Sequence, residues 1–438
     1  MTSLYRFYLV GKRRWVGSVY QRGQRPFEQL NQIGDMSDVF EPTLTDNTGT
    51  GFDREVSDTL IDRFVDAIEV PGEVLAVGCG RGHDILSLAN RSIETIGIDL
   101  CAEALTVAKA RVPDAIFRRM DCRSLKYPPE TFVGVWSRLS LSHSQLESVS
   151  NSLKEFAKVL KPRGVLGIRV TEDIPGDSIE SALWRMIEST GFQKLGIQHS
   201  AIDRSIQVLA VRREADSNRV DTEEEFNCVL CPTARFKFNR EVGLLSASSI
   251  LWGDQDLYVI PDIAPLTEGH LLIATTSHHI CFGDCHDSLI PKLEAIKDRV
   301  RRLFQDAYRK ATLFFEHGPA KCHEGGACIE HAHWHCLPIS VPIRQAIAHY
   351  FGEGYPASLK TLQNLYKNGQ SYLYVEDEGS GWVYPVSMLT SQFLRQIVTM
   401  LLGKGAWRWQ TGCKNPETQA VYRSTLERLL PIVDSEMI

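Results

Sequence analysis

Several features that mark membrane, secreted and nucleic-acid-binding proteins are absent from this chain of 438 residues. It has no run of about 18 apolar residues, so we expect no membrane-spanning helix. Its first twenty residues lack the positive, apolar and small segments of a secretory signal. It has no excess of positive charge, since the net charge is -6, which argues against general nucleic-acid binding. The eleven cysteines are an odd number without a secretory signal, which argues against a disulfide framework and predicts reduced thiols and a cytoplasmic location.

The residues that are present divide the chain into parts of different composition. A basic beginning is followed by alternating strand and helix patterns, then by a charged stretch with almost no aliphatic residues. Ten of the thirteen histidines lie at or beyond His270, so the second half is suited to different chemistry from the first. We predict an N-terminal extension, partly disordered, at 1–51, a first domain at 52–213, a linker at 214–226 and a second domain at 227–438.

The first domain alternates short apolar runs with helical patterns. Such alternation predicts a doubly wound, mostly parallel sheet with helices on both faces, which is an α/β fold. The charged turn at 161–164 is expected to separate the second of two long helices from the strand that follows. The expected strands are 74–78, 95–100, 116–121, 132–137, 165–170, 196–200 and 206–212, with helices at 102–111 and 145–160.

A glycine-rich turn follows the first expected strand, with Gly78, Gly80 and Gly82 in the pattern G-x-G-x-G. A dinucleotide site would need the pattern G-x-G-x-x-G, and hence a glycine at His83. Asp99 ends the second strand, where a carboxylate can accept both hydroxyl groups of an adenosine ribose. These residues therefore predict a nucleoside cofactor held at the ends of the first strands.

Residues 52–213 resemble the class I S-adenosylmethionine-dependent methyltransferases on these motifs. The resemblance implies S-adenosylmethionine as cofactor and a methyl acceptor that the sequence does not name. Two positions depart from the family, because Ala76 and Val133 stand where acidic residues are usual. These departures favour the alternative that this half binds or senses its cofactor without methyl transfer. The implied cofactor contacts are Gly78, Gly80, Gly82, Asp99, Asp121 and Cys122.

The second domain carries histidine at every second position of one segment: His331, His333 and His335. Alternate residues of a strand point to one face, so three imidazoles converge there. An apolar core has no use for such a group, which indicates a catalytic or ligand-binding site.

Residues 226–438 resemble the histidine-triad (HIT) superfamily, with an extended C-terminal half. The resemblance implies an antiparallel-sheet α+β domain in which His333 attacks a nucleotide phosphate to form a nucleotidyl-histidine, while His335 binds and polarises the phosphate. A hydrolase, a phosphorylase and a nucleotidyltransferase all stay open. A homodimer also stays open, as does a single chain whose C-terminal half takes the place of a partner.

Two cysteines, Cys228 and Cys231, open this domain as a C-x-x-C pair, which in a reduced protein is redox-active or half of a metal site. In zinc-bearing HIT proteins such a pair is joined by two histidines. The resemblance therefore implies a structural Zn²⁺ with the ligands Cys228, Cys231, His278 and His331, and His279 is a rival for the third position.

These predictions combine into one hypothesis, a bifunctional protein. Its first half is an S-adenosylmethionine-dependent methyltransferase, and its second half cleaves a phosphoanhydride of a small-molecule nucleotide. The alternative is a regulatory protein that binds a nucleotide or S-adenosylmethionine through a degenerate methyltransferase half.

Overall fold

The computed structural model describes most of the two expected domains. The predicted N-terminal extension and the linker lie outside the described residues. Within the described residues no helix is both long enough and apolar enough to cross a membrane. The described ranges are 60–141, 146–172, 178–200, 205–213, 228–231, 235, 239, 242–244, 249–321, 329–387, 392–404 and 412–436.

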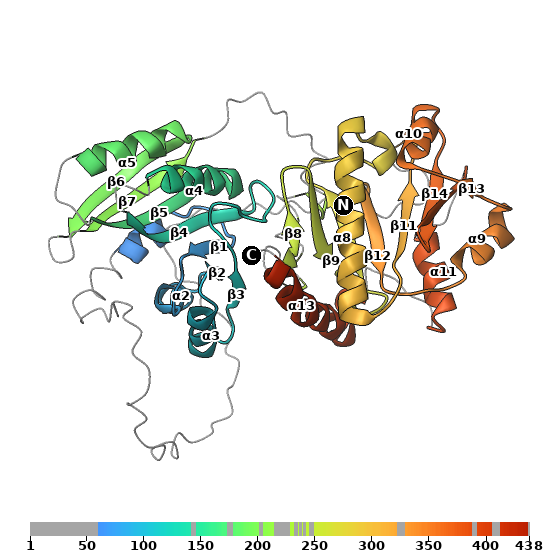
Figure 1. The fold of residues 1–438 in the computed structure, drawn as a ribbon, viewed down its shortest axis with the longest axis horizontal. Coiled ribbons are helices and arrows are strands. Elements are labelled where there is room, and N and C mark those ends of the chain that lie inside the picture. The colour runs from blue at the N-terminus through green and yellow to red at the C-terminus, as the bar shows by residue number, and fades with distance from the viewer. Residues whose placement is uncertain are drawn as a thin grey trace, which may run out of the picture. The chain divides into compact units, whose positions relative to one another are not determined.

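The first domain contains a seven-stranded sheet in the order β3-β2-β1-β4-β5-β7-β6 (Figure 1). The five strands from β3 to β5 are parallel, and β7 and β6 continue the sheet in antiparallel pairing. The predicted α/β class and mostly parallel sheet are confirmed. The strands are β1 (Val74–Val77), β2 (Thr95–Asp99), β3 (Ile116–Arg119), β4 (Phe132–Leu141), β5 (Leu160–Glu172), β6 (Phe192–Ser200) and β7 (Ser205–Arg212).

Helices cover both faces of this sheet because successive residues of β1 are buried on opposite sides. Leu75 packs with α4 on one face, and Val74 packs with the helical residues 60–66 on the other. The chain order reverses beside β1, since β2 and β4 flank it. Ligands of open α/β sheets bind at such a switch point, outside the carboxyl ends of the strands. The helices are α2 (His83–Ala89), α3 (Ala102–Arg111), α4 (Leu146–Val159) and α5 (Ser178–Ser189).

The expected start of the fifth strand was wrong. We expected a turn at 161–164, but β5 begins at Leu160, directly after α4. Pairing with β4 jumps from Phe132↔Leu160 to Gly134↔Val165, so four residues bulge out within the strand. Arg163 has the left-handed φ of 62° there. The sequence showed that residues 161–164 leave the regular strand path. It did not show that the residues on both sides of them pair with β4.

The second domain contains an eight-stranded sheet in the order β13-β15-β14-β11-β12-β10-β9-β8 (Figure 1). All its described pairings are antiparallel, which confirms a second, antiparallel-sheet domain. The strands are β8 (Trp252–Gly253), β9 (Leu257–Pro261), β10 (Leu271–Thr275), β11 (Leu313–Gly318), β12 (His333–Leu337), β13 (Tyr355–Pro356), β14 (Tyr372–Asp377) and β15 (Ser380–Pro385).

The two faces of the second sheet pack against different helices. On one face Trp334 lies in an apolar cluster with Leu293 and Val300 of the helix α8 (Ile290–Tyr308). On the opposite face the ring of Phe315 stacks on that of His335, beside the helix α11 (Phe393–Leu401). The face opposite to His335 is thus packed by apolar residues. The remaining helices are α9 (Ile343–Phe351), α10 (Leu359–Lys367), α13 (Pro416–Glu436) and the short 3-10 turns η3 (Phe282–Asp284) and η4 (Asp287–Leu289).

The packed face also buries the carboxyl group of Glu316 on β11. It accepts hydrogen bonds from the Phe282 backbone N–H at 2.7 Å and from Trp334 Nε1 and Tyr372 Oη, each at 3.1 Å. Burial raises the pKa of Glu316 to about 7, despite these hydrogen bonds. The carboxyl group is therefore substantially protonated in the folded protein near neutral pH.

This burial predicts a pH-dependent stability. The unfolded chain loses the Glu316 proton from about pH 4.5, whereas the folded chain keeps it to about pH 7. The free energy of unfolding should therefore fall as pH rises through this window, by about 3 kcal/mol in all. Glu316→Gln should remove that contribution, measured as the variant-minus-wild-type difference in urea midpoint between pH 4.5 and 8.

The matched control is Glu353→Gln, at an exposed position of the same domain. Its difference from wild type should not change across the same pH range. A Glu316→Gln difference that is equally flat would show that the buried carboxyl group does not titrate in this window.

Candidate functional site

The glycine turn of the first domain follows β1, which lies between β2 and β4 in its sheet. Gly78, Gly80 and Gly82 all have left-handed φ values, of 63°, 50° and 79°. Such values favour glycine and bring the backbone N–H groups toward the open end of the sheet. A Cβ built on Gly80 would meet nothing within 4 Å, so space for a ligand lies in front of the turn.

Asp99 at the end of β2 holds this turn in place. Its carboxylate accepts the Gly80 N–H at 2.8 Å and the Cys101 N–H at 2.9 Å. Each oxygen keeps a lone pair for a further donor, since an ionised carboxylate offers about four acceptor sites. The four residues Gly78, Gly80, Gly82 and Asp99 are therefore brought together as predicted.

Asp121 and Cys122 lie after β3 with partners of their own. The Arg123 guanidinium pairs with the Asp121 carboxylate through Nη2 at 2.6 Å, and this pairing lowers the pKa of Asp121. The Cys122 thiol lies 3.3 Å from Ser152 Oγ. Their predicted contact with an adenine stays a prediction.

The two positions that depart from the methyltransferase pattern are filled by packing. Ala76 is buried against Ile85 and Val112. Val133 is buried, and its methyl group would lie 2.3 Å from a Cβ at Gly72. A carboxylate at either place would be buried among apolar neighbours.

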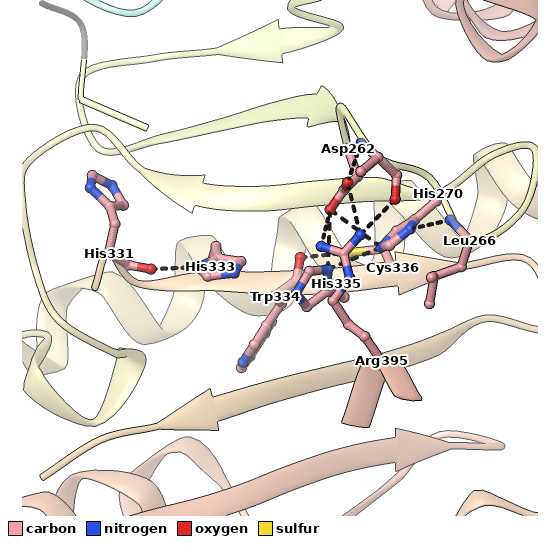
Figure 2. A network of polar contacts seen from close by, with 10 residues as sticks. Asp262, Leu266, His270, His331, His333, Trp334, His335, Cys336 and Arg395 are labelled. Atoms are coloured by element: carbon pink, nitrogen blue, oxygen red, sulfur yellow. Dashed lines mark hydrogen bonds and ion pairs between the residues drawn. The ribbon is translucent and has the colours of Figure 1, made fainter. Parts of the chain in front are cut away.

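In the second domain the triad histidines lie along β12 and the residues before it (Figure 2). Their hydrogen bonds fix the tautomers. His331 donates from Nε2 to the Thr275 carbonyl oxygen at 2.7 Å, which leaves a lone pair on Nδ1. His333 donates from Nδ1 to the His331 carbonyl oxygen, which leaves a lone pair on Nε2. His333 is half-buried, whereas His331 and His335 are fully buried, so His333 is the one of the three that a ligand reaches most easily.

A fourth histidine, His270, continues the network. Its Nδ1 accepts the Leu266 N–H at 3.1 Å, so the proton of the neutral ring sits on Nε2. That Nε2 lies 3.0 Å from His335 Nδ1 and donates to it, which places the His335 proton on Nε2. His335 therefore presents a donor to the site. Burial lowers the pKa of His270 to about 3 and that of His333 to about 4, so both rings are neutral at neutral pH.

A buried ion pair lies beside these rings (Figure 2). Arg395 of α11 donates to the Asp262 carboxylate at 2.8 and 3.1 Å and to the Ala264 carbonyl oxygen at 2.6 Å. Asp262 Oδ2 is 3.5 Å from His335 Nδ1. Although burial acts in the opposite direction, Arg395 and His270 lower the pKa of Asp262 to about 2.

Asp262, His270 and His335 are close enough to suggest a metal site, but their chemistry argues against one. The two facing ring nitrogens already share a proton, and the Arg395 guanidinium repels a cation. We therefore assign this trio to the hydrogen-bond network.

The four predicted zinc ligands do converge. One atom from each of Cys228, Cys231, His278 and His331 lies within 4.8 Å of all the others. The sulfur-to-Nδ1 distances are 3.3 Å for Cys231–His278, 3.4 Å for Cys228–His331 and 3.5 Å for Cys231–His331. Tetrahedral zinc with bonds of about 2.3 Å to sulfur and about 2.0 Å to nitrogen separates such atoms by about 3.5 Å. The donor set therefore fits zinc.

The rival ligand His279 faces elsewhere, because its Nδ1 lies 3.5 Å from Asp284 Oδ2. The nearby Cys281 and Cys285 are buried and donate to the carbonyl oxygens of Pro319 and Cys281. These contacts occupy both thiols without a metal.

The roles of His270, Asp262 and Arg395 were not predicted from the sequence. His270 and Asp262 flank a turn between two apolar strands, and their convergence on β12 depends on strand pairing. Arg395 could have been singled out from the sequence, because it is the single charged residue in the apolar run 393–402. A charge in such a run is buried only when it is paired.

Two different protein families match the two domains of this chain. Residues 75–168 match a family described as methyltransferase domain. Together with the sheet order, this match identifies the first domain as a methyltransferase domain with a Rossmann-like fold. Residues 247–352 match a family described as protein similar to CwfJ C-terminal, a description that names no histidine-triad chemistry.

Individual relatives each match about a third of this chain. Phosphoethanolamine N-methyltransferase 3 of Arabidopsis thaliana is 28% identical over 184 residues, which cover 37% of this chain and 36% of that protein. The S-adenosyl-L-methionine-dependent Diels-Alderase iccD of Talaromyces variabilis is 26% identical over 147 residues, or 32% of this chain and 50% of that protein. Magnesium protoporphyrin IX methyltransferase of Synechocystis, solved with bound S-adenosylmethionine, is 19% identical over 36% of this chain and 79% of that chain, with a TM-score of 0.32. The chain thus spans half or less of the length of the two curated relatives.

Proposed function

We propose that the second domain cleaves a phosphoanhydride bond of a nucleotide through a covalent nucleotidyl-histidine at His333. The observation that carries this proposal is the fixed tautomer of His333, whose Nδ1–H is bound to the His331 carbonyl oxygen. A neutral imidazole with a free Nε2 lone pair is the nucleophile that such chemistry needs. The proposal rests on this geometry and on the resemblance to the histidine-triad superfamily.

The chain's own residues supply each step. His333 Nε2 attacks the α-phosphorus and forms a P–N bond, while the P–O bond to the leaving phosphate breaks and its electron pair leaves with that oxygen. The positive charge that develops on His333 is spread through Nδ1–H to the His331 carbonyl. His335 Nε2–H donates to a non-bridging phosphate oxygen, where negative charge increases. Water then attacks phosphorus, the P–N bond breaks, and a water proton is released as the lone pair returns to Nε2.

In this proposal Zn²⁺ is structural, held by Cys228, Cys231, His278 and His331. Four protein ligands leave no open position for a substrate. The site fixes the ring of His331, and the carbonyl of the same residue orients His333. His331 thus connects the metal site to the nucleophile, because its ring binds the metal and its carbonyl oxygen orients His333.

The test is to incubate the protein with α-labelled adenine and guanine nucleotides and with dinucleoside polyphosphates, and then to quench with alkali. Alkali-stable, acid-labile label on the protein is the expected result. Neither label nor a nucleotide product from zinc-loaded protein would overturn the proposal.

For the first domain we propose S-adenosylmethionine-dependent methyl transfer to a small molecule. S-adenosylmethionine, when bound, supplies the activated methyl group. The glycine turn and the Asp99 carboxylate would hold its nucleoside, as the open space before Gly80 and the spare lone pairs of Asp99 allow. The methyltransferase match and the names of the relatives support this proposal.

Asp99→Ala should weaken S-adenosylmethionine binding by about ten- to a hundredfold, because hydrogen bonds to a carboxylate are worth about 1.5–3 kcal/mol. The variant also loses the acceptor that positions the Gly80 N–H. Isothermal titration calorimetry gives the dissociation constant. Asp114→Ala, at an exposed position of the same domain, is the matched control and should bind as wild type does. If the Asp99 variant bound S-adenosylmethionine as tightly as wild type does, the cofactor would have to bind elsewhere.

A second candidate function for this domain is cofactor binding without methyl transfer. It is favoured by the packing that fills positions 76 and 133, and by the resemblance to a protein named as an S-adenosyl-L-methionine-dependent Diels-Alderase. Tight binding of S-adenosylmethionine without release of S-adenosylhomocysteine, over a broad panel of small-molecule acceptors, would support this candidate. Release of S-adenosylhomocysteine would exclude it.

A further inference from the structure

A pocket lies beside the triad, on the same face of the second sheet. His335 pairs with Leu272 of β10, which in turn pairs with Ile260 of β9, and residues paired across strands share a face. Leu272, Ile260 and Asp262 line the pocket. Neighbouring strands are about 4.8 Å apart, so the pocket centre lies within about 10 Å of the triad strand. A nucleotide can therefore reach from the pocket to His333.

The pocket is lined mainly by aliphatic side chains. Aliphatic side chains of this kind can pack against a planar base. The walls alone would select for no particular base. The aliphatic lining residues are Val229, Leu230, Ile260, Ile263, Leu272 and Ile329.

Four polar side chains interrupt this apolar lining, and two of them, Asp262 and Arg395, pair with each other. Arg235 is 3% exposed, and its guanidinium lies over the ring of Tyr258 at 4.6 Å. Asn239 is 2% exposed. Among the described residues, no acceptor is within hydrogen-bond range of Arg235 Nε, Arg235 Nη1 or Asn239 Nδ2. Buried donors without acceptors are costly, and a bound ligand that brings acceptors removes the cost.

All three unsatisfied atoms are donors, which restricts the ligand. An exocyclic amino group, as on adenine, would set a donor against these donors. A 6-oxopurine offers O6 and N7 side by side, the acceptor pair to which arginine most often binds. Asn239 Nδ2 can donate to the same edge.

We infer that Arg235 and Asn239 make this pocket a specificity site for a 6-oxopurine, so that the preferred substrate is a guanine nucleotide. This inference rests on the proposed nucleotidyl chemistry, which it deepens by naming the base. Asp262 and Arg395, in the same lining, lie between the base and the phosphate-binding histidines.

The test separates base recognition from chemistry by measuring both. Equilibrium binding of GMP, IMP, AMP and UMP to the full chain is compared by calorimetry, and kcat/KM is measured for the α-labelled guanine and adenine substrates. We expect GMP and IMP to bind about ten- to a hundredfold more tightly than AMP. IMP keeps O6 and N7 and lacks the 2-amino group of guanine, so equal binding of IMP and GMP assigns the preference to that edge.

Arg235→Met keeps the length of the side chain and removes its donors. It should reduce the GMP-to-AMP preference to less than about threefold. The control is Arg299→Met, because Arg299 also lies over an aromatic ring, that of Trp252 at 4.2 Å, on a residue that does not line the pocket. A melting temperature for each variant shows whether it folds, and the wild-type comparison of the four nucleotides needs no variant at all.

Selective binding of GMP without any turnover would contradict the nucleotidyl chemistry and leave the pocket assignment intact. Turnover with an adenine or uracil preference would overturn the pocket assignment and leave the chemistry intact. An unchanged GMP preference in folded Arg235→Met would also overturn it.

Discussion

His333→Asn will abolish covalent labelling by α-labelled nucleotides and lower kcat/KM by at least about four orders of magnitude, as loss of a covalent nucleophile does in other enzymes. Asparagine keeps much of the size of the ring but cannot form a stable P–N bond. The side chain is half-buried, so the fold should tolerate the change.

His349→Asn is the matched control, because this histidine lies exposed on α9, away from the triad. Its label and rate should equal those of wild type. Label that persists in the His333 variant would move the nucleophile to another residue, and the fixed tautomer of His333 would then need another role.

His278→Asn will lose its metal, whereas His279→Asn will keep it. The two residues are adjacent, but only His278 places its Nδ1 3.3 Å from Cys231 Sγ. Losing one of four ligands leaves two thiolates and one imidazole in a half-buried site. Because binding of structural zinc contributes directly to folding free energy, we expect the melting temperature to fall by about 10 °C or more.

Elemental analysis of purified protein measures the outcome. Wild type and His279→Asn should each carry about one zinc per chain, and His278→Asn close to none. Loss of zinc in the His279 variant alone would reverse the assignment, and no zinc in wild type would remove the metal from the site.

The C-x-x-C pair and the alternating histidines could be picked out from the sequence because they occur in short, regular spacings, whereas His278 was added to the predicted ligands only through the resemblance to zinc-bearing HIT proteins. Every second residue of β12 shares a face, so three histidines at 331, 333 and 335 converge whatever the rest of the fold does. The strands of the first domain were likewise readable, since buried parallel strands are continuous apolar runs.

The remaining features depend on contacts between distant parts of the chain. The ion pair of Asp262 with Arg395 joins residues that are 133 positions apart, and nothing near either residue names its partner. The burial of Glu316 likewise follows from its neighbours Phe282, Trp334 and Tyr372, which come from three separate segments. The bulge in β5 could not be predicted from the sequence, because a charged turn and a bulge have the same composition.

Arg395 also has a consequence for folding. It is the counterion of a fully buried carboxylate beside the histidines, and it comes from α11, which is far from β9 and β12 in the sequence. A chain in which α11 has not yet docked would hold Asp262 as a buried charge without its counterion, which is strongly unfavourable. The histidine network and α11 are therefore expected to become ordered together, as one cooperative unit.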